Sequence, residues 1–223
     1  MACKNLKIFV EGNIGAGKSK FCEYFGSMSS DVETFLEPIS LWRDCKGFDL
    51  YNLMHKNVAT YAGPFQANVV ATYLHLLMRE QRKPVRLVER SILTSQRCFT
   101  RIAFDSGIME PNDYNSLHEY FEWALNFECT QPDLIVYLRA SPEECLKRIQ
   151  ARNRKSEEGL DLSFLTKLHQ FHEQWLNPIN KPEIGEAPVF IFDASQPWDE
   201  LKDTYDQKKE DLLLFGTKND FIE

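Results

Sequence analysis

The residues best suited to chemistry lie near the start of the chain, in the run Gly12-Asn-Ile-Gly-Ala-Gly-Lys18-Ser19. Three glycines at this spacing let the backbone take positive φ angles and approach a ligand closely. In such a loop the backbone N–H groups converge on phosphate oxygens, the lysine neutralises phosphate charge, and the serine hydroxyl offers an oxygen to Mg²⁺. The sequence therefore predicts a phosphate-binding loop made of Gly12, Asn13, Ile14, Gly15, Ala16, Gly17, Lys18 and Ser19.

The neighbours of this loop favour the same interpretation. An apolar run at residues 6–10 predicts a buried strand, and the amphipathic segment 21–25 predicts a helix that begins near Gly17. A chance match in an ordinary glycine turn is the alternative. A strand before the loop and a helix after it are, however, the context that confirms such motifs.

Charged residues follow two further apolar runs. Residues 32–36 end at Glu37, and residues 85–88 end at the cluster Glu89-Arg90-Ser91. Because ligands of parallel α/β sheets bind outside the carboxyl ends of the strands, we expect these side chains to face the same crevice as the phosphate loop. On composition alone, a solvated position on the surface is the commoner fate of a glutamate such as Glu37.

Strands and helices alternate along the chain. Residues 134–138 and 189–192 predict two more strands, and helices are expected at 48–57, at 62–82, through Phe99 and Phe104, at 114–127, from 142 onward, at 161–176 and at 198–215. This alternation indicates a three-layer α/β fold of the P-loop kinase-like type, with a parallel sheet of about five strands flanked by helices. The sequence contains no linker or repeat, so residues 1–223 are expected to form a single domain.

Composition argues against several classes of protein. A net charge of −7 gives no basic field for nucleic acid. No apolar run reaches the roughly 18 residues of a membrane span, and the phosphate loop starts too close to Met1 for a signal peptide, so we expect an intracellular, cytoplasmic protein without a membrane partner. Six scattered cysteines suggest neither disulfides nor a metal site, and His169 and His172 lack a third ligand.

A phosphate-binding loop alone fits several kinds of enzyme. GTPases also need a guanine-reading Asn-Lys-x-Asp segment, which the sequence lacks, and motor-type ATPases usually end a strand with a metal-binding Asp where this chain has Leu138-Arg139. What is left is a small kinase whose acceptor binds near Glu37, Gln66 and the Glu89-Arg90-Ser91 cluster. The basic residues at 148–155 are either a phosphate clamp or a solvated helix end.

Taken in order, these motifs resemble the deoxyribonucleoside kinase family, which includes thymidine kinase 2-type, deoxycytidine, deoxyguanosine and insect multisubstrate kinases. The resemblance covers about the whole chain. Besides the phosphate loop, it rests on Glu37-Pro38, Trp42-Arg43, Leu53-Met54, Pro64-Phe65-Gln66, Glu89-Arg90-Ser91, Arg148-x-x-x-Arg152-x-Arg154 and the segment from Leu168-His169 to Trp175-Leu176. It implies an ATP- and Mg²⁺-dependent kinase that converts deoxyribonucleosides to monophosphates in nucleotide salvage.

The resemblance also implies catalytic roles. Glu37 would be the base that takes the proton from the nucleoside 5′-hydroxyl, and Arg90 would steady that carboxylate and the transferred phosphoryl group. Lys18 would be the third catalytic residue. Glu89 would hold Mg²⁺ together with Ser19, partly through water. Positioning and charge neutralisation would supply most of the rate enhancement.

A lid and a sugar-binding subsite follow from the same resemblance. Arg152 and Arg154 would lie in an Arg-rich lid at about residues 148–159, which closes over the ATP phosphates and excludes water. His55 stands where the family usually has a tyrosine that binds the sugar 3′-hydroxyl together with a glutamate near the lid, and Glu157 would supply that glutamate. A histidine donates from a shorter side chain, so recognition of this hydroxyl would be weaker or dependent on pH.

The remaining matches describe a slot for the nucleobase. Gln66 would pair with the edge of the base through its amide, which both donates and accepts hydrogen bonds. The walls of the slot would be Trp42, Phe65, Val69 and Phe99, because flat aromatic side chains suit a flat ligand.

Two positions bear on the choice of base. Tyr73 and Ser95 occupy places that carry Arg and Asp in the purine- and deoxycytidine-type enzymes. Loss of that charged pair, together with the bulk of Tyr73, favours a pyrimidine, and thymidine over deoxycytidine. Tyr73 is also larger than the Met expected in thymidine-type members, so a narrowed methyl cleft that shifts preference towards deoxycytidine is the alternative.

Two other functions compete with the leading one. A thymidylate-type nucleoside monophosphate kinase would need extra cations for the acceptor phosphate. A catalytically silent nucleotide-binding family member would have no physical need for Lys18, Glu37 and Arg90 together. The resemblance further implies a homodimer and feedback inhibition by a deoxynucleoside triphosphate.

Overall fold

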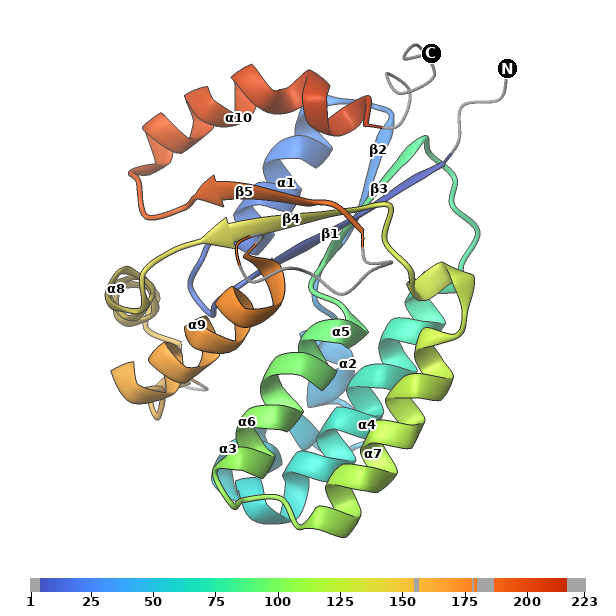
Figure 1. The fold of residues 1–223 in the computed structure, drawn as a ribbon, viewed down its shortest axis with the longest axis vertical. Coiled ribbons are helices and arrows are strands. Elements are labelled where there is room, and N and C mark those ends of the chain that lie inside the picture. The colour runs from blue at the N-terminus through green and yellow to red at the C-terminus, as the bar shows by residue number, and fades with distance from the viewer. Residues whose placement is uncertain (1–4, 155–156, 178, 180–186, 216–223) are drawn as a thin grey trace.

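The computed structural model describes residues 5–154, 157–177, 179 and 187–215, and a five-stranded sheet lies at its centre (Figure 1). The strands lie in the order β2-β3-β1-β4-β5, and every neighbouring pair is parallel. Their bounds are β1 (Leu6–Gly12), β2 (Val32–Phe35), β3 (Val85–Glu89), β4 (Leu134–Arg139) and β5 (Val189–Asp193).

Helical segments connect the strands. They are α1 (Lys18–Met28), α2 (Ile39–Arg43), α3 (Leu50–Lys56), α4 (Val58–Leu77), α5 (Ile92–Thr94), η1 (Ser95–Thr100), α6 (Arg101–Asp105), α7 (Pro111–Leu125), η2 (Glu128–Thr130), α8 (Pro142–Arg152), α9 (Leu162–Leu176) and α10 (Trp198–Leu213). The segments α5, η1 and α6 follow one another without a gap, so the helix expected through Phe99 and Phe104 is one run with a π-helical turn in its middle. Such turns are frequent at functional sites.

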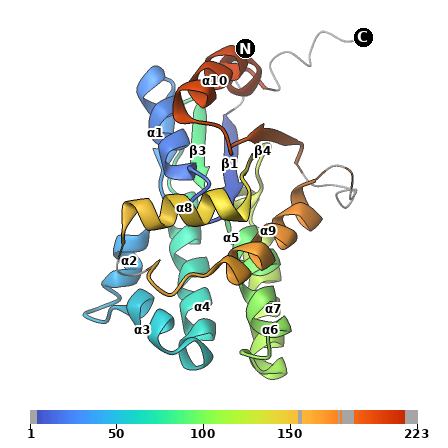
Figure 2. The same ribbon diagram turned by 90° about the vertical axis from the view of Figure 1, so that its left-hand side faces the viewer.

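Helices cover both faces of the sheet, which explains why consecutive residues of β1 and β4 are apolar and buried. On β1, Ile8 and Val10 pack with residues of α1, α8 and α10, while Phe9 packs on the other face with residues of α4 and α7. Figure 1 shows α10 and the group of α4, α6 and α7 on opposite sides of the sheet, and Figure 2 brings α8 to the front. The predicted three-layer α/β fold is therefore confirmed.

Side-chain caps set the starts of two predicted helices. The side chain of Asp49 caps α3, so this helix starts after residue 49 and not at 48. The side chain of Asn57 caps α4 in the same way, so α4 begins four residues before the predicted start at 62 and includes Pro64. Side-chain capping set both starts, and hydrophobic periodicity does not report it.

The strand ends that carry charged residues meet at one edge of the sheet. β1 pairs with β3 in a register that places Val10 opposite Glu89, and β3 pairs with β2 so that Val88 lies opposite Phe35. The loops that leave these three strands therefore emerge side by side. This is the arrangement that parallel topology predicts for the phosphate loop, Glu37 and Glu89.

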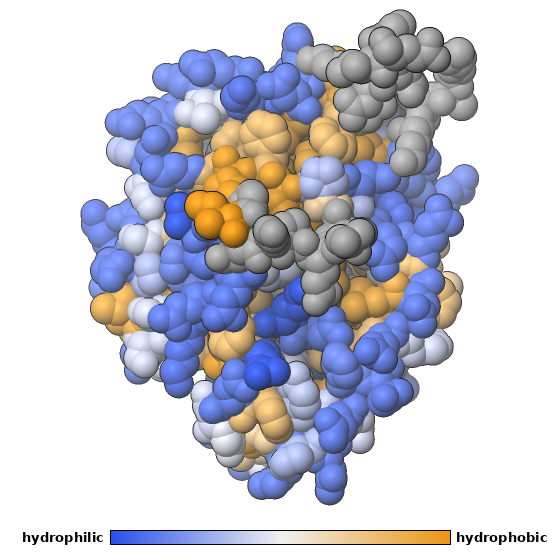
Figure 3. Space-filling model, viewed as in Figure 1, coloured by the Kyte–Doolittle hydropathy of each residue, from blue (hydrophilic) through white to orange (hydrophobic). Residues whose placement is uncertain are grey.

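The surface seen in Figure 3 is mostly hydrophilic, with apolar side chains gathered around β5. β5 is an edge strand, and its Ile191 is 36% exposed. Within the described ranges, no helix is long and apolar enough to cross a membrane.

One arginine is buried inside the sheet layer. Arg86 on β3 is 2% exposed and its Nε donates to Glu33 Oε1 on β2, with 2.6 Å between the atoms. Its Nη1 and Nη2 donate to the carbonyl oxygens of Leu77 and Arg79, at 3.3 and 3.0 Å. These bonds fix the C-terminal end of α4 against β3.

Replacing Glu33 with Gln is expected to lower the free energy of unfolding by about 3 kcal/mol, because the guanidinium of Arg86 then stays buried without a counter-charge. Urea unfolding at pH 7 measures this change. Asp105→Asn is the matched control: it breaks the exposed Arg101–Asp105 ion pair and should cost less than about 1 kcal/mol. An equal decrease in the free energy of unfolding in the two variants would contradict the idea that burial of Arg86 makes its ion pair with Glu33 important.

Candidate active site

The phosphate loop is shaped by close contacts that only glycine permits. Gly12 has a φ of +144°, and a Cβ at this position would lie 2.6 Å from the carbonyl oxygen of Leu138. Gly15 has a φ of +84°, and its Cβ would lie 2.7 Å from the carbonyl oxygen of Cys145. β4 and α8 therefore press directly against the loop, and any side chain at these two positions would displace it.

Residues of the loop divide into those that line a cavity and those that support it. Ile14, Gly15, Gly17, Lys18 and Ser19 line the cavity. The other three predicted phosphate-loop residues, Gly12, Asn13 and Ala16, are buried and do not line it. Asn13 anchors the loop, since its Nδ2 donates to the carbonyl oxygen of Leu165 at 2.9 Å.

Lys18, the first residue of α1, is folded back over the loop. Its Nζ donates to the carbonyl oxygen of Asn13 at 2.8 Å, and the residue is 5% exposed. Burial, helped by the nearby charge of Arg90, lowers the pKa of Lys18 to about 8. A bound phosphate would replace the carbonyl as the partner of this ammonium group and would favour its charged form.

Two oxygen-bearing side chains converge beside Lys18. Ser19 Oγ donates to Glu89 Oε1 at 2.7 Å, and Glu89 Oε2 accepts from the backbone N–H of Glu37 at 3.3 Å. Hydroxyl and carboxylate oxygens are ligands that Mg²⁺ prefers, and Mg²⁺ commonly uses only one or two protein groups together with phosphates and water. The donor set therefore fits Mg²⁺, and no cluster of three or more His, Cys, Asp or Glu occurs in the described part of the chain to suggest another metal site.

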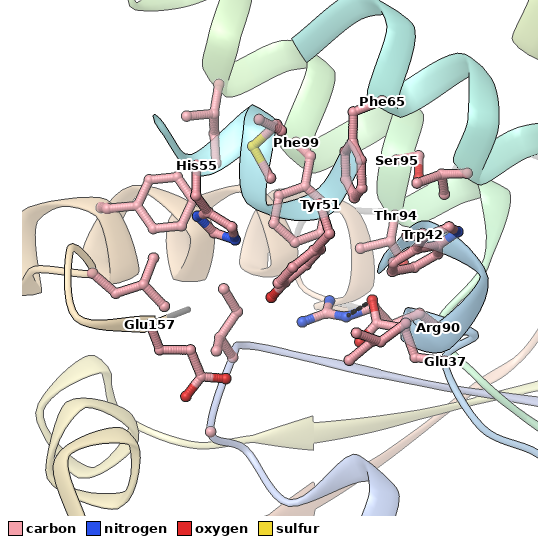
Figure 4. A pocket seen from close by; sticks show the side chains of 18 of the residues that line it. Glu37, Trp42, Tyr51, His55, Phe65, Arg90, Thr94, Ser95, Phe99 and Glu157 are labelled. Atoms are coloured by element: carbon pink, nitrogen blue, oxygen red, sulfur yellow. Dashed lines mark ion pairs between the residues drawn. The ribbon is translucent and has the colours of Figure 1, made fainter. Parts of the chain in front are cut away.

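Glu37 and Arg90 face each other where the loop meets the rest of the cavity (Figure 4). Arg90 Nε lies 3.4 Å from Glu37 Oε1, and Arg90 Nη1 donates to the carbonyl oxygen of Gly12 at 3.1 Å. Burial raises the pKa of Glu37, an effect that the charge of Arg90 opposes and that of Glu89 reinforces. Arg90 also has a φ of 61°, a left-handed conformation that costs a residue with a side chain about 1 kcal/mol.

An aromatic slot continues from this pair. The whole cavity measures about 1310 Å³ and reaches from the phosphate loop to α3 and α4. Trp42 and Phe65 form one wall, with ring centroids 5.4 Å apart in an edge-to-face contact. Gln66 Oε1 is buried and accepts no hydrogen bond from the described residues, so a ligand could satisfy it. The other residues predicted for the slot also line the cavity: Val69, Tyr73, Ser95 and Phe99.

The predicted lid and sugar-binding residues meet at the other end of the cavity. Glu157, only 7% exposed, accepts from Arg152 Nε and Nη2 at 2.7 Å each, and it lies 3.8 Å from Arg154 Nη1. His55 also lies at this end of the cavity, above Glu157 in the view of Figure 4. Burial lowers the pKa of His55, and its Nε2 has no hydrogen-bond partner among the described residues.

The arginine-rich stretch does not act as one cluster. Arg148 donates to Glu144 at 2.9 Å and to the carbonyl oxygen of Gln196 at 3.2 Å, and it does not line the cavity. Only Arg152 and Arg154 of its arginines line it. Residues 155 and 156 of the predicted lid lie outside the described ranges.

Two residues of the site, Tyr51 and Glu11, had not been predicted. Tyr51 stands between the rings of Trp42 and His55, 6.5 and 4.6 Å from their centroids. Its position one helical turn before His55 was the available signal. Glu11 is fully buried beneath the site, where it accepts hydrogen bonds from Ser91, at 2.6 Å, and from Thr94. The sequence signal for Glu11 was an acidic residue in an otherwise apolar strand. Burial raises the pKa of Glu11.

Together, the loop, the Glu37–Arg90 pair and the aromatic slot define a class of protein: a P-loop enzyme that transfers a phosphoryl group from a nucleotide to a small, flat acceptor. Comparison with known proteins gives the family. Residues 8–215 match the deoxynucleoside kinase family. The chain therefore belongs to that family and is a kinase, and the family implies ATP as the phosphoryl donor.

Individual relatives agree with this assignment. Human mitochondrial thymidine kinase 2 is 35% identical over 210 residues, which cover 94% of this chain and 78% of that protein. Chicken deoxycytidine kinase 2 is 29% identical, covering 89% of this chain and 86% of its own. Human deoxycytidine kinase is 28% identical, covering 94% of this chain and 90% of its own. The resemblance seen in the sequence motifs is thus confirmed.

The pKa of Glu37 is raised and that of Lys18 is lowered, and together these shifts predict a bell-shaped pH dependence of kcat/KM for ATP, measured with saturating nucleoside. If Glu37 is the base, activity is lost as pH falls through its raised pKa, because the carboxylate must be unprotonated. Activity should fall again above about pH 8, where Lys18 loses its proton. Lys18→Arg should remove this upper limb while leaving the acidic one, since a guanidinium stays charged. A wild-type profile that stays flat above pH 8 would contradict the assignment to Lys18.

Proposed function

We propose that this kinase phosphorylates the 5′-hydroxyl of pyrimidine deoxyribonucleosides, thymidine ahead of deoxycytidine, with ATP as donor and Mg²⁺ as cofactor. The observation that carries the proposal is the position of the Glu37–Arg90 pair, which lies in one cavity between the phosphate loop and the aromatic slot. A nucleoside with its base in the slot would direct its 5′-hydroxyl past Glu37 towards the phosphate loop.

Each charged residue then has a separate task. Glu37 accepts the proton of the 5′-hydroxyl while that oxygen attacks the γ-phosphorus of ATP, the bond from the γ-phosphorus to the bridging oxygen breaks, and ADP leaves. The raised pKa of Glu37 makes it a stronger base. Arg90 holds the carboxylate of Glu37 and stabilises charge on the phosphoryl group in transit. Lys18 neutralises the phosphate oxygens at the loop. The transition state requires little covalent help, so positioning and charge neutralisation supply most of the rate.

Ser19 and Glu89 would hold Mg²⁺, partly through water. Their oxygens lie 2.7 Å apart, close enough to share one ion. When bound, Mg²⁺ offsets the negative charge of the donor phosphates. The carboxylate of Glu89 also accepts from the Glu37 backbone, which keeps the base close to the metal-binding group.

The composition of the slot supports a pyrimidine. Tyr73 is 1% exposed, and its ring lies 6.3 Å from that of Trp42, so it occupies space that a purine would need. Neither Tyr73 nor Ser95 carries a charge. The amide of Gln66 offers one donor and one acceptor to the edge of a pyrimidine. A higher identity to thymidine kinase 2, 35% against 28% for human deoxycytidine kinase, supports thymidine as the better acceptor.

His55 and Glu157 would bind the sugar 3′-hydroxyl. The carboxylate of Glu157 holds Arg152 in the present structure, so contact with the sugar would loosen that pair. Arg152 and Arg154 would then be able to turn towards the donor phosphates, which is the lid role expected from the sequence.

We also propose properties of the whole molecule. Residues 1–223 would act as a single domain, since the family match spans 8–215. A homodimer would cover apolar surface such as Trp123 on α7, which is 51% exposed.

A deoxynucleoside triphosphate would inhibit the enzyme by reaching both the slot and the phosphate loop of the same cavity. Free cysteines among the described residues fit a cytoplasmic location, whereas the human relative named above is mitochondrial by name.

Competition between acceptors tests the proposed function. With thymidine and deoxycytidine together in one MgATP assay, kcat/KM for thymidine should be higher by about tenfold, the usual value of one well-fitted methyl group. Tyr73→Met with Ser95→Ala should reduce this ratio. Faster reaction of deoxycytidine would instead favour the narrowed methyl cleft. Phosphorylation of thymidine monophosphate but of no nucleoside would refute the proposal.

Glu37→Gln is expected to keep nucleoside affinity within about twofold but to lower kcat by at least about 100-fold, because the amide keeps the shape of the site and cannot accept the proton. Steady-state kinetics and nucleoside binding by calorimetry provide the two measurements. Wild-type turnover in this variant would remove Glu37 from the mechanism.

A further inference from the structure

Tyr73 contacts more than the base slot. Its buried ring lies beside Trp42, but its hydroxyl extends beyond the slot and donates a 2.7 Å hydrogen bond to the backbone carbonyl oxygen of Glu89. Glu89 is the last residue of β3 and the first of the charged cluster at the end of that strand. A side chain of the base slot is therefore bonded to the backbone that carries the phosphoryl-transfer residues.

The peptide unit between Glu89 and Arg90 is held at both ends. Its carbonyl oxygen accepts from Tyr73, and its N–H donates to the carbonyl oxygen of Val10 on β1 at 2.9 Å. Arg90 has the unfavourable φ of 61°. Turning this peptide over would bring that φ to a negative value, but it would break both hydrogen bonds. The two bonds therefore oppose relaxation of the strained turn.

The side chains on either side of this peptide are those that the proposed mechanism uses. Glu89 Oε1 accepts from Ser19, and Glu89 Oε2 accepts from the backbone of Glu37. Arg90 Nε lies 3.4 Å from Glu37 Oε1. If the strained turn relaxed, the backbone that carries both side chains would shift relative to Glu37, and a misplacement of about 1 Å is enough to lower a rate severely.

We propose that Tyr73 is a positioning residue for phosphoryl transfer. Its hydroxyl holds the peptide between Glu89 and Arg90 and thereby keeps the Glu89 carboxylate and the Arg90 guanidinium against Glu37. This role is separate from that of the Tyr73 ring, which limits the size of the base. The inference rests on the roles proposed above for Glu37, Glu89 and Arg90.

Tyr73→Phe separates the two roles, because it removes the hydroxyl and keeps the ring. The expected result is a kcat for thymidine lower by about tenfold. The KM for thymidine and the thymidine-to-deoxycytidine ratio should stay within about twofold of wild type. A kcat within about twofold of wild type would overturn the inference. So would a loss confined to KM, since the hydroxyl would then act in substrate binding.

Tyr137→Phe is the matched control. Tyr137 is also 1% exposed, and its hydroxyl ties β4 to Glu173 on α9 at 2.8 Å, but it does not line the cavity. Thermal unfolding should show a loss of stability in both variants, whereas only Tyr73→Phe should lose kcat. Equal losses of kcat would indicate general loosening of the fold and would overturn the positioning role.

A double-mutant cycle with Arg90→Lys completes the test. If Tyr73 acts in part through Arg90, Tyr73→Phe should lower kcat by clearly less than tenfold once Arg90 is replaced, because the share of the effect that passes through Arg90 is then already lost. A full additional loss in that background would overturn the inference. Wild-type kcat in Arg90→Lys alone would refute the proposed mechanism itself, and this outcome is distinguishable from a wild-type kcat in Tyr73→Phe.

Discussion

The carboxyl edge of the sheet has to keep five ionisable groups largely out of water. Glu11, Glu37 and Glu89 bring negative charge, and Lys18 and Arg90 bring positive charge. An unpaired charge in such a place would destabilise the fold, so every one of these side chains has a polar partner in the strand ends or in the phosphate loop and α1 beside them. The arrangement of β1, β2 and β3 as neighbours is what allows this, because it delivers all five groups to one edge.

Burial also gives the cluster its chemical character. It raises the pKa of Glu11 and Glu37 and lowers that of Lys18, so each group is pushed towards its neutral form. A group in this condition gives up or accepts a proton more readily near neutral pH than it would on the surface. The charges that hold the edge together are therefore also suited to catalysis of phosphoryl transfer.

Much of this arrangement could be predicted from the sequence, because parallel strands place their carboxyl ends together. That rule located Glu37 and Glu89 beside the phosphate loop, and the glycine pattern located the loop itself. Neither pattern could reveal the ion pair of Arg86, because its partner Glu33 lies 53 residues away on another strand. Nor could either pattern reveal bonds to main-chain atoms, such as that of Tyr73, because carbonyl oxygens leave no trace in the side-chain pattern.

The arginine-rich stretch predicted as a lid shows the same limit at short range. A motif of arginines predicts a phosphate clamp, yet Arg152 donates to Glu157, five residues away. Arg148 donates to Glu144 and does not line the cavity. Which partner an arginine takes depends on local backbone geometry and on what else occupies the cavity. Spacing alone reports neither.

The two attachments of α4 to β3 have a mechanical consequence. Near the cavity, the hydroxyl of Tyr73 on α4 donates to the carbonyl oxygen of Glu89 on β3. At the far end of α4, Arg86 on β3 donates to the carbonyl oxygen of Leu77, so these two hydrogen bonds oppose sliding of α4 along β3. α2 is attached to the same helix, since Trp42 Nε1 donates to Thr72 Oγ1 on α4 at 2.9 Å, whereas α3 buries no residue fully. The slot therefore has a stiff side built on α4, and a ligand too large for it would displace α3 more readily than α4.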